Sequence, residues 1–310
     1  MTAPTTPLST PATSAPIVLA GATGSLGLLI AHHLRQRGAP VRAVVRPGFS
    51  KAAERESLRL QGAEVVAVDF HDAAALQQAC TGAACVVSAL SGLREVIVDA
   101  QTQLLEAAVA AGVPRFIPSD YSADFTRLPD GSNRNFDLRR EFHRRLDAAP
   151  IRATSIFNGM FMELLKGQAP LLLPGIRRVL YWGSADQALD LTTMPDVAAY
   201  TAAAALDATT PRYLCIAGDV LTIRGLQAVA SQVTGHPYRL LRAGGLGLLA
   251  TLTRITKTVA PAPDDVFPPW QGMQYLHNML SGQAKLRSLD NDRYPGLRWT
   301  KVRDLLAGGL

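Results

Sequence analysis

The chain has only three cysteines among 310 residues, and no long apolar run. The cysteines show neither a disulfide framework nor the spacing of metal ligands, which is typical of a reducing, cytoplasmic compartment. We expect Cys80 and Cys85, next to a predicted strand, to be small core residues. Because no apolar run reaches the ~18 residues that a spanning helix needs, we expect no membrane partner.

A secretory signal is also missing at the start of the chain. Residues 1–15 are mostly Thr, Pro, Ser and Ala, and they lack a basic beginning and an apolar centre. Such a composition buries too little apolar surface to fold, so we expect a flexible tail. The net charge of +6 comes from basic residues that are scattered outside one helix. A cofactor that carries phosphates explains this excess better than nucleic acid, which we do not expect as a partner.

The most informative pattern present is a glycine-rich turn between an apolar strand and an amphipathic helix. The turn has the form G-x-x-G-x-x-G, a variant of the dinucleotide-binding fingerprint, in the strand-turn-helix context that the fingerprint requires. Glycine lets the backbone approach a pyrophosphate, which the amides and the dipole of the helix N-terminus favour. The alternative is an ordinary strand-turn-helix. The predicted cradle consists of Gly21, Thr23, Gly24, Ser25, Leu26 and Gly27.

Short β-branched runs alternate with helical stretches up to Asn158, which predicts an α/β fold with a doubly wound parallel sheet. The predicted strands are Ile17–Ala20, Val41–Val45, Glu64–Val68, Ala84–Ser88, Arg115–Pro118 and Ile151–Phe157. The predicted helices between them are Ser25–Arg37, Lys51–Gln61, Ala73–Cys80, Leu93–Ala111 and Asn135–Ala148. Residues 16–158 are therefore expected to form a nucleotide-binding Rossmann domain.

After Asn158 prolines become frequent and the strict alternation ends. Thr192 or Thr193 is expected to begin a helix over Val197–Leu206, which a strand over Arg212–Ile216 follows. We expect residues 192–217 to rejoin the large sheet. Residues 159–191 and 218–310 are expected to form a smaller substrate-binding lobe, in which Trp270–Leu280 is a helix that either lines an apolar pocket or packs in the core.

The residues after the second strand predict which dinucleotide binds. An acidic residue there would accept hydrogen bonds from the ribose, whereas Arg46 is suited to a 2′-phosphate and Lys51 adds a second charge. These residues favour NADP(H) over NAD(H), although two solvated loop cations are the alternative. Asp69 and Phe70 are expected beside the adenine, and Ser88 on the nicotinamide side.

The chain lacks the Tyr-x-x-x-Lys dyad with which short-chain dehydrogenases exchange a proton. None of its seven tyrosines is followed by lysine four residues later. The chain nevertheless resembles the atypical short-chain dehydrogenases of the NmrA-like and isoflavone reductase-like type over nearly its whole length. The resemblance lies in GATGSLG at 21–27, RFIPSDY at 115–121, FNG at 157–159, DNDRYPG at 290–296 and Trp299.

This resemblance implies a Rossmann domain, a small C-terminal substrate lobe and a preference for NADPH. Isoflavone reductase-like enzymes carry a lysine on the helix after the Pro-Ser segment, and Arg139 stands at the matching position. A guanidinium stays protonated, so Arg139 cannot act as a general acid or base, but it can polarise a carbonyl or hold an anion. Members of the group include reductases of aromatic or quinone substrates and regulators that sense the redox state of the cofactor.

Helical spacing gives an independent view of the helix that carries Arg139. The side chains expected to face the core are Leu138, Phe142, Leu146 and Ala149. Arg140 and Arg144 are expected to be ordinary solvated charges. Arg139 and His143 are expected at the edge of the apolar stripe, where Arg139 is either functional or merely extends its charged end into solvent.

The candidate catalytic residues are Tyr121, Arg139 and Asn158. The function that we favour is an NADPH-dependent oxidoreductase that transfers hydride to a small aromatic or quinone-like carbonyl or enone. A quinone is the easier substrate without the dyad, because solvent can protonate its reduced oxygen. The alternative is a non-catalytic NADP(H)-binding redox sensor with a regulatory protein partner. Sugar epimerisation is a weaker option, because it needs the Tyr/Lys pair.

Overall fold

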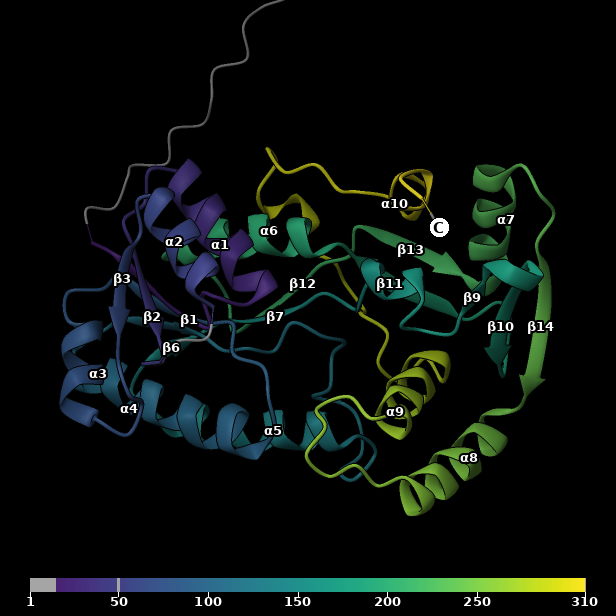
Figure 1. Ribbon diagram of the computed structural model, residues 1–310, viewed down its shortest axis with the longest axis horizontal. Coiled ribbons are helices and arrows are strands. Elements are labelled where there is room, and N and C mark those ends of the chain that lie inside the picture. The colour runs from purple at the N-terminus through teal and green to yellow at the C-terminus, as the bar shows by residue number, and fades with distance from the viewer. Residues whose placement is uncertain (1–14, 49–50, 310) are drawn as a thin grey trace, which may run out of the picture.

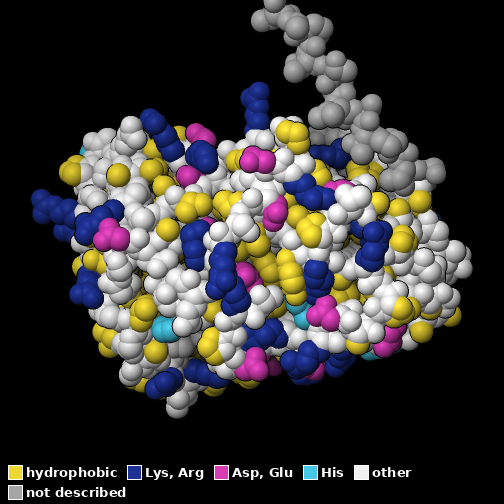
Figure 2. Space-filling model, turned by 180° about the vertical axis from the view of Figure 1, so that it is seen from behind, with side chains coloured by type: hydrophobic (Ala, Val, Ile, Leu, Met, Phe, Trp, Pro, Cys, Tyr) yellow, Lys and Arg dark blue, Asp and Glu magenta, His cyan; other side chains and the backbone are white. Residues whose placement is uncertain are grey.

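The computed structural model describes residues 15–48 and 51–309, so nearly all of the expected tail lies outside the described residues. Two parts lie side by side in Figure 1: a sheet with helices on both faces, and a smaller part built from short strands and helices. On the face seen in Figure 2, basic and acidic side chains are interspersed, with hydrophobic side chains between them.

The larger part contains a six-stranded parallel sheet in the order β3-β2-β1-β4-β5-β6. Its strands are β1 (Ile17–Ala20), β2 (Val41–Val45), β3 (Glu64–Ala67), β4 (Cys85–Ser88), β5 (Arg115–Ile117) and β6 (Arg152–Ala153). The central strands β1 and β4 are buried along their whole length, as expected for a parallel sheet covered on both faces. The order reverses between β1 and β4, which is where an open sheet of this kind binds its ligand.

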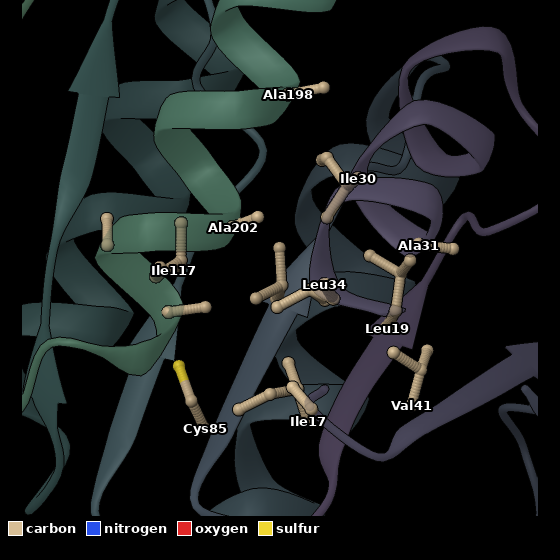
Figure 3. Packing of buried hydrophobic residues seen from close by; sticks show 14 of the residues in the cluster. Ile17, Leu19, Ile30, Ala31, Leu34, Val41, Cys85, Ile117, Ala198 and Ala202 are labelled. Atoms are coloured by element: carbon tan, nitrogen blue, oxygen red, sulfur yellow. The ribbon is translucent and has the colours of Figure 1, made fainter. Parts of the chain in front are cut away.

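Helices from both halves of the chain cover the two faces of this sheet. The helices are α1 (Ser25–Gln36), α2 (Ala52–Leu60), α3 (Ala73–Cys80), α4 (Gln101–Ala110), α5 (Arg134–Ala148) and α6 (Met194–Leu206). One hydrophobic cluster joins the sheet to α1, α2 and α6, and a second cluster joins its other face to α3, α4 and α5. Figure 3 shows the first cluster, in which Ile30 and Leu34 of α1 meet side chains of α6 and of the strands. Each such buried aliphatic side chain contributes about 1.5–3 kcal/mol.

The structure corrects two of the predicted elements. The strand expected over Ile151–Phe157 is interrupted at Thr154, where β6 ends and β7 (Ser155–Phe157) begins. The interruption lets β6 pair with β5, while β7 pairs with β12 (Tyr213–Cys215) in a separate two-stranded sheet. The helix expected over Leu93–Ala111 begins as a π-helical turn, η1 (Glu95–Ala100), and continues as α4.

The entry into α6 follows the predicted signals. Thr193 is the N-cap, and its hydroxyl accepts a hydrogen bond from Asp196 N at 3.2 Å. The helix packs against α1, which places this late segment on the same face of the sheet as the first crossover. The fold therefore brings residues 194–206 back to the larger part.

The smaller part has two short sheets, in the orders β13-β11-β8 and β14-β10-β9, and its own hydrophobic core. Its strands are β8 (Met160–Phe161), β9 (Leu172–Leu173), β10 (Arg178–Trp182), β11 (Ala188–Thr192), β13 (Asp219–Thr222) and β14 (Arg239–Gly244). Its helices are α7 (Ile223–Thr234), α8 (Leu246–Val259), α9 (Pro269–Leu280) and α10 (Val302–Ala307). Its short helical turns are η2 (Met162–Lys166) and η3 (Pro174–Ile176), whereas η4 (Asn291–Arg293) lies against the larger part, where Arg293 Nε donates to Asp207 just after α6. Within the described residues, no helix is long and apolar enough to cross a bilayer.

Candidate functional site

The glycine turn between β1 and α1 is packed so closely that side chains cannot be accommodated there. Gly21 has a φ of +76°, and a Cβ on it would lie 2.5 Å from Ala89 O. A Cβ on Gly27 would lie 2.2 Å from Gly21 O. Gly24 is the N-cap of α1 and supplies no capping side chain, so the first amides of the helix have no cap to bind. The uncapped amides at the start of α1 are the backbone donors that a diphosphate requires.

Basic residues flank this turn on one side. Arg46 follows β2, is exposed, and makes no hydrogen bond or ion pair with another described residue through its side chain. Lys51 has a left-handed φ of 67° and donates from Nζ to Thr23 O at 2.9 Å. Arg55, which the sequence analysis did not single out, donates from Nη2 to Arg46 O. Its signal was its position one helical turn after Lys51. The three cations therefore gather beside the glycine turn.

The predicted adenine-side residues have different environments. Asp69 is exposed, and its Oδ1 accepts a hydrogen bond from His71 N at 3.0 Å. Phe70 is 9% exposed and packs in the hydrophobic cluster on the α3 side of the sheet. Both follow β3, two strands from β1 in the sheet order. Their contact with an adenine stays a prediction.

Two predicted residues at the carboxyl ends of strands have buried polar groups without partners. Ser88 ends β4 and Asn158 follows β7, and both are fully buried. The hydroxyl of Ser88 and both polar atoms of the Asn158 side-chain amide lack a hydrogen-bond partner within the described residues. The Asn158 backbone is held by Ser122 O at 2.8 Å and by the Thr192 hydroxyl at 2.7 Å. Buried polar groups are normally satisfied, so unpaired ones at this edge of the sheet are suited to a ligand.

Arg139 lies where α5 meets the end of β5. Its Nε donates to Ser119 O and its Nη1 donates to Asn135 O, each at 3.1 Å. Ser119 in turn donates from its hydroxyl to Leu90 O at 2.6 Å, which ties the ends of β4 and β5 together. The buried Gln101 amide, a second residue that the sequence analysis did not identify, accepts a hydrogen bond from Ser119 N at 2.9 Å. Two backbone carbonyls thus fix Arg139 beside the carboxyl end of β5.

Tyr121 lies on the opposite face of the sheet from the helix that carries Arg139. Its ring is 8% exposed and belongs to the cluster under α1 and α6, whereas α5 packs on the opposite face of the sheet. Burial raises the pKa of the Tyr121 phenol well above its usual value. Such a phenol holds its proton strongly, which argues against proton exchange with a substrate.

The structure also corrects the expectations for two other residues of α5. Arg140 is no solvated charge: it donates to Phe125 O and Leu128 O at 3.0 Å and pairs with Asp137. His143 is 6% exposed and lies away from any rim. Helical spacing gives an angular position but cannot tell which loop folds over that position. Arg144 is exposed as expected.

His143 belongs to a buried polar network. Its Nε2 lies 2.8 Å from Asp120 Oδ2 and 3.4 Å from the Ser155 hydroxyl, which accepts a hydrogen bond from Arg212 at 2.6 Å. Burial opposes ionisation of Asp120, but the charge and hydrogen bond of His143 outweigh it and hold the pKa of that carboxyl below its usual value. Asp120 and Ser155 both face Nε2, so this is not the relay of a serine hydrolase, in which they bind opposite nitrogens.

The parallel sheet, the crossover at β1 and the glycine turn define a Rossmann-like α/β protein. The model of the NmrA-like family matches residues 13–259, and the chain belongs to that family. Pinoresinol reductase 1 from Arabidopsis thaliana is 31% identical over 200 residues, which are 60% of this chain and 63% of that relative. The match thus spans less than two thirds of the relative's length.

Solved structures share the fold at lower identity. AtPrR2 with NADP+ and (+)-pinoresinol has a TM-score of 0.78 at 22% identity, covering 96% of this chain and 99% of that one. Isoflavone reductase has a TM-score of 0.80 at 21% identity with the same coverage. An NADPH-dependent quinone oxidoreductase from Escherichia coli has a TM-score of 0.70 at 22% identity, covering 94% of this chain and 98% of that one. These likenesses support the expected isoflavone reductase-like architecture.

Proposed function

We propose that this protein binds NADP(H) and transfers hydride from NADPH to a small aromatic or quinone-like carbonyl or enone. The glycine turn carries the proposal, because Gly21 and Gly27 let its backbone pack closely against β4 and α1, and the uncapped amides at the start of α1 are suited to a diphosphate. Arg46, Lys51 and Arg55 supply positive charge where a 2′-phosphate would be held. Among the structural neighbours, AtPrR2 was solved with NADP+ and the E. coli protein is named as NADPH-dependent.

The bound cofactor would supply the hydride, and the chain would align the two reactants and exclude water. The unpaired groups of Ser88 and Asn158 are suited to orient the nicotinamide or the substrate. Arg139 would stabilise negative charge on the substrate oxygen, without giving up its proton. This chemistry suits a quinone, whose reduced oxygen solvent can protonate. The pinoresinol reductase and quinone oxidoreductase relatives support a phenolic or quinone-like substrate.

A non-catalytic redox sensor is the second candidate. The observation that favours it concerns two of the three candidate catalytic residues: Tyr121 is buried and Arg139 is bound to two carbonyl groups. Such a protein would bind NADP(H) and signal its occupancy to a protein partner without turnover. Turnover experiments separate the two candidates, whereas cofactor titrations do not.

Calorimetric titration of NADPH and NADH against wild type, Arg46→Ala and Arg59→Ala tests the cofactor part of the proposal. Loss of a charged hydrogen bond should cost Arg46→Ala about 1.5–3 kcal/mol for NADPH and little for NADH. Arg59 is a matched control, because it is an exposed cation on α2 that pairs with Glu56. Equal losses for the two cofactors would remove Arg46 from the 2′-phosphate site.

Oxidation of NADPH by a panel of quinones and enones tests the reductase part. We expect turnover above the buffer rate for at least one quinone. We also expect Arg139→Gln, which removes the charge and keeps a polar side chain, to lower kcat more than it raises KM. If NADPH binds but no member of the panel is reduced, the reductase is refuted and the redox sensor takes its place.

A further inference from the structure

A cavity lined by η1, α5, α8 and α9 lies away from the glycine turn. It has a volume of about 410 Å³, which falls within the range of small-molecule sites. Its walls come from the larger part, through η1 and α5, and from α8 and α9 of the smaller part. Its lining includes Arg94, Arg134, Leu138, Glu141, Arg144 and Lys257. None of them belongs to the predicted cofactor cradle.

The carboxylates in this cavity already have cationic partners. Glu141 accepts hydrogen bonds from both terminal nitrogens of Arg94. Asp130 and Asp137 both pair with Arg140, the former through Nε at 3.0 Å. The bidentate pair satisfies Glu141, whereas Asp130 and Asp137 share one guanidinium, so the lining holds two more cations than acids.

Three cations in the same wall lack such partners. Arg134, Arg144 and Lys257 form no ion pair with an acidic side chain in the described chain. The Arg134 guanidinium and the Lys257 ammonium lie 4.7 Å and 5.0 Å from the ring of the buried Trp270. Arg134 also donates to Asp265 O and Val266 O, at 2.8 Å and 2.9 Å. Two cations held near one ring concentrate positive charge at this side of the cavity, which attracts an anion.

We propose that this cavity binds a small organic dianion, with its carboxylate or phosphate groups on Arg134, Arg144 and Lys257 and its carbon frame against Leu138. The proposal combines a cavity of ligand size with an excess of unpaired positive charge and one apolar wall. It stands apart from the proposed reductase activity, because it uses none of the residues assigned to the cofactor.

The cavity lies between the two parts of the molecule, so a ligand in it would contact both. Arg144 belongs to α5, which also carries Arg139, whereas Lys257 belongs to α8 in the smaller part. A dianion that contacts both side chains joins the two parts of the molecule. Ligand binding to the folded state alone stabilises that state, so the unfolding temperature should rise with ligand concentration.

Calorimetric titration of the full chain with phthalate, a compact aromatic dicarboxylate, tests the proposal at low ionic strength. The variants are Arg144→Gln and Lys257→Gln, and the matched control is Arg254→Gln, an exposed cation on α8 that does not line the cavity. We expect each lining variant to bind phthalate about fivefold more weakly, a change typical of one partly exposed ion pair. The control should bind like wild type. Thermal unfolding without ligand identifies any variant that fails to fold.

A second arm repeats the titration with saturating NADP+. Unchanged phthalate affinity supports a separate site, whereas displacement by NADP+ places the anion in the cofactor cradle and overturns the proposal. Absence of phthalate binding to wild type, or equal weakening in all three variants, also overturns it. The outcome is independent of whether the protein reduces quinones, because no turnover is measured.

Discussion

Replacement of Gly27 by alanine tests whether the turn between β1 and α1 is as tightly packed as the geometry indicates. The new Cβ would lie 2.2 Å from Gly21 O and 2.8 Å from Ala22 Cα. Both are backbone atoms of the turn, so neither can rotate away as the end of a flexible side chain would. The turn must therefore shift relative to α1 to accept a single methyl group.

Two opposing effects determine how Gly27→Ala changes the free energy of unfolding. Overpacking in a tightly packed region costs about 1–3 kcal/mol, and contact with fixed backbone belongs at the upper end of that range. Alanine also stabilises the folded state by about 1 kcal/mol, because it favours a helix more than glycine does. We therefore expect Gly27→Ala to lower the free energy of unfolding by about 2 kcal/mol. NADPH affinity should fall as well, because the shift displaces the amides that would hold the diphosphate.

Gly272 in α9 offers a matched control. It is also a helical glycine, but a Cβ added there has no heavy atom within 4 Å. Gly272→Ala should raise the free energy of unfolding by about 0.5–1 kcal/mol, through helix propensity alone. Urea unfolding gives the stabilities, and calorimetry gives the NADPH affinities. If Gly27→Ala is as stable as Gly272→Ala and keeps the wild-type affinity, the reasoning about the cradle is refuted.

Two further predictions concern buried charges. Because the pKa of Asp120 is held below its usual value, the ionised carboxyl stabilises the fold above the unfolded pKa of about 3.9, and this contribution is lost as pH falls through the lower folded pKa. Urea unfolding gives the difference in free energy of unfolding between wild type and Asp120→Asn, and this difference should shrink below pH 4. A difference that does not depend on pH contradicts the pairing of Asp120 with His143. Lys285→Met should cost about 3–5 kcal/mol by leaving the buried Asp190 unpaired. The same change at Arg224, in an exposed pair, should cost less than about 1 kcal/mol, and similar losses would disprove the distinction.

The sequence-based predictions were accurate for the regular elements of the larger part. The bounds of β1, β2 and α3 agree with the structure, and α1 begins at Ser25 as predicted. These elements are specified locally, by apolar runs of strand length, by glycine at the turn and by helical spacing. The same kind of local signal predicted Thr192 or Thr193 at the entry into α6; Thr193 is the cap, and the helix begins at Met194, three residues before the predicted Val197.

The predictions for side-chain environments were less accurate, because those environments depend on distant segments. Arg140 is covered by the loop that carries Phe125 and Leu128. His143 is paired with Asp120 across 23 residues, and a break at Thr154 divides one predicted strand between two partners. None of these contacts has a counterpart in local spacing.

The amino-acid sequence by itself determined the glycine turn, the strand and helix on either side of it and the placing of Arg46 after the second strand, because each of these depends on residues close together in the chain. Only the tertiary structure decided which side of the sheet Tyr121 occupies and which charges remain unpaired. Arg134 and Lys257, for example, are 123 positions apart and meet at Trp270 only because α8 and α9 fold against α5. The free energy of a charge depends on its nearest partners in space, and those partners are set by packing across the whole molecule.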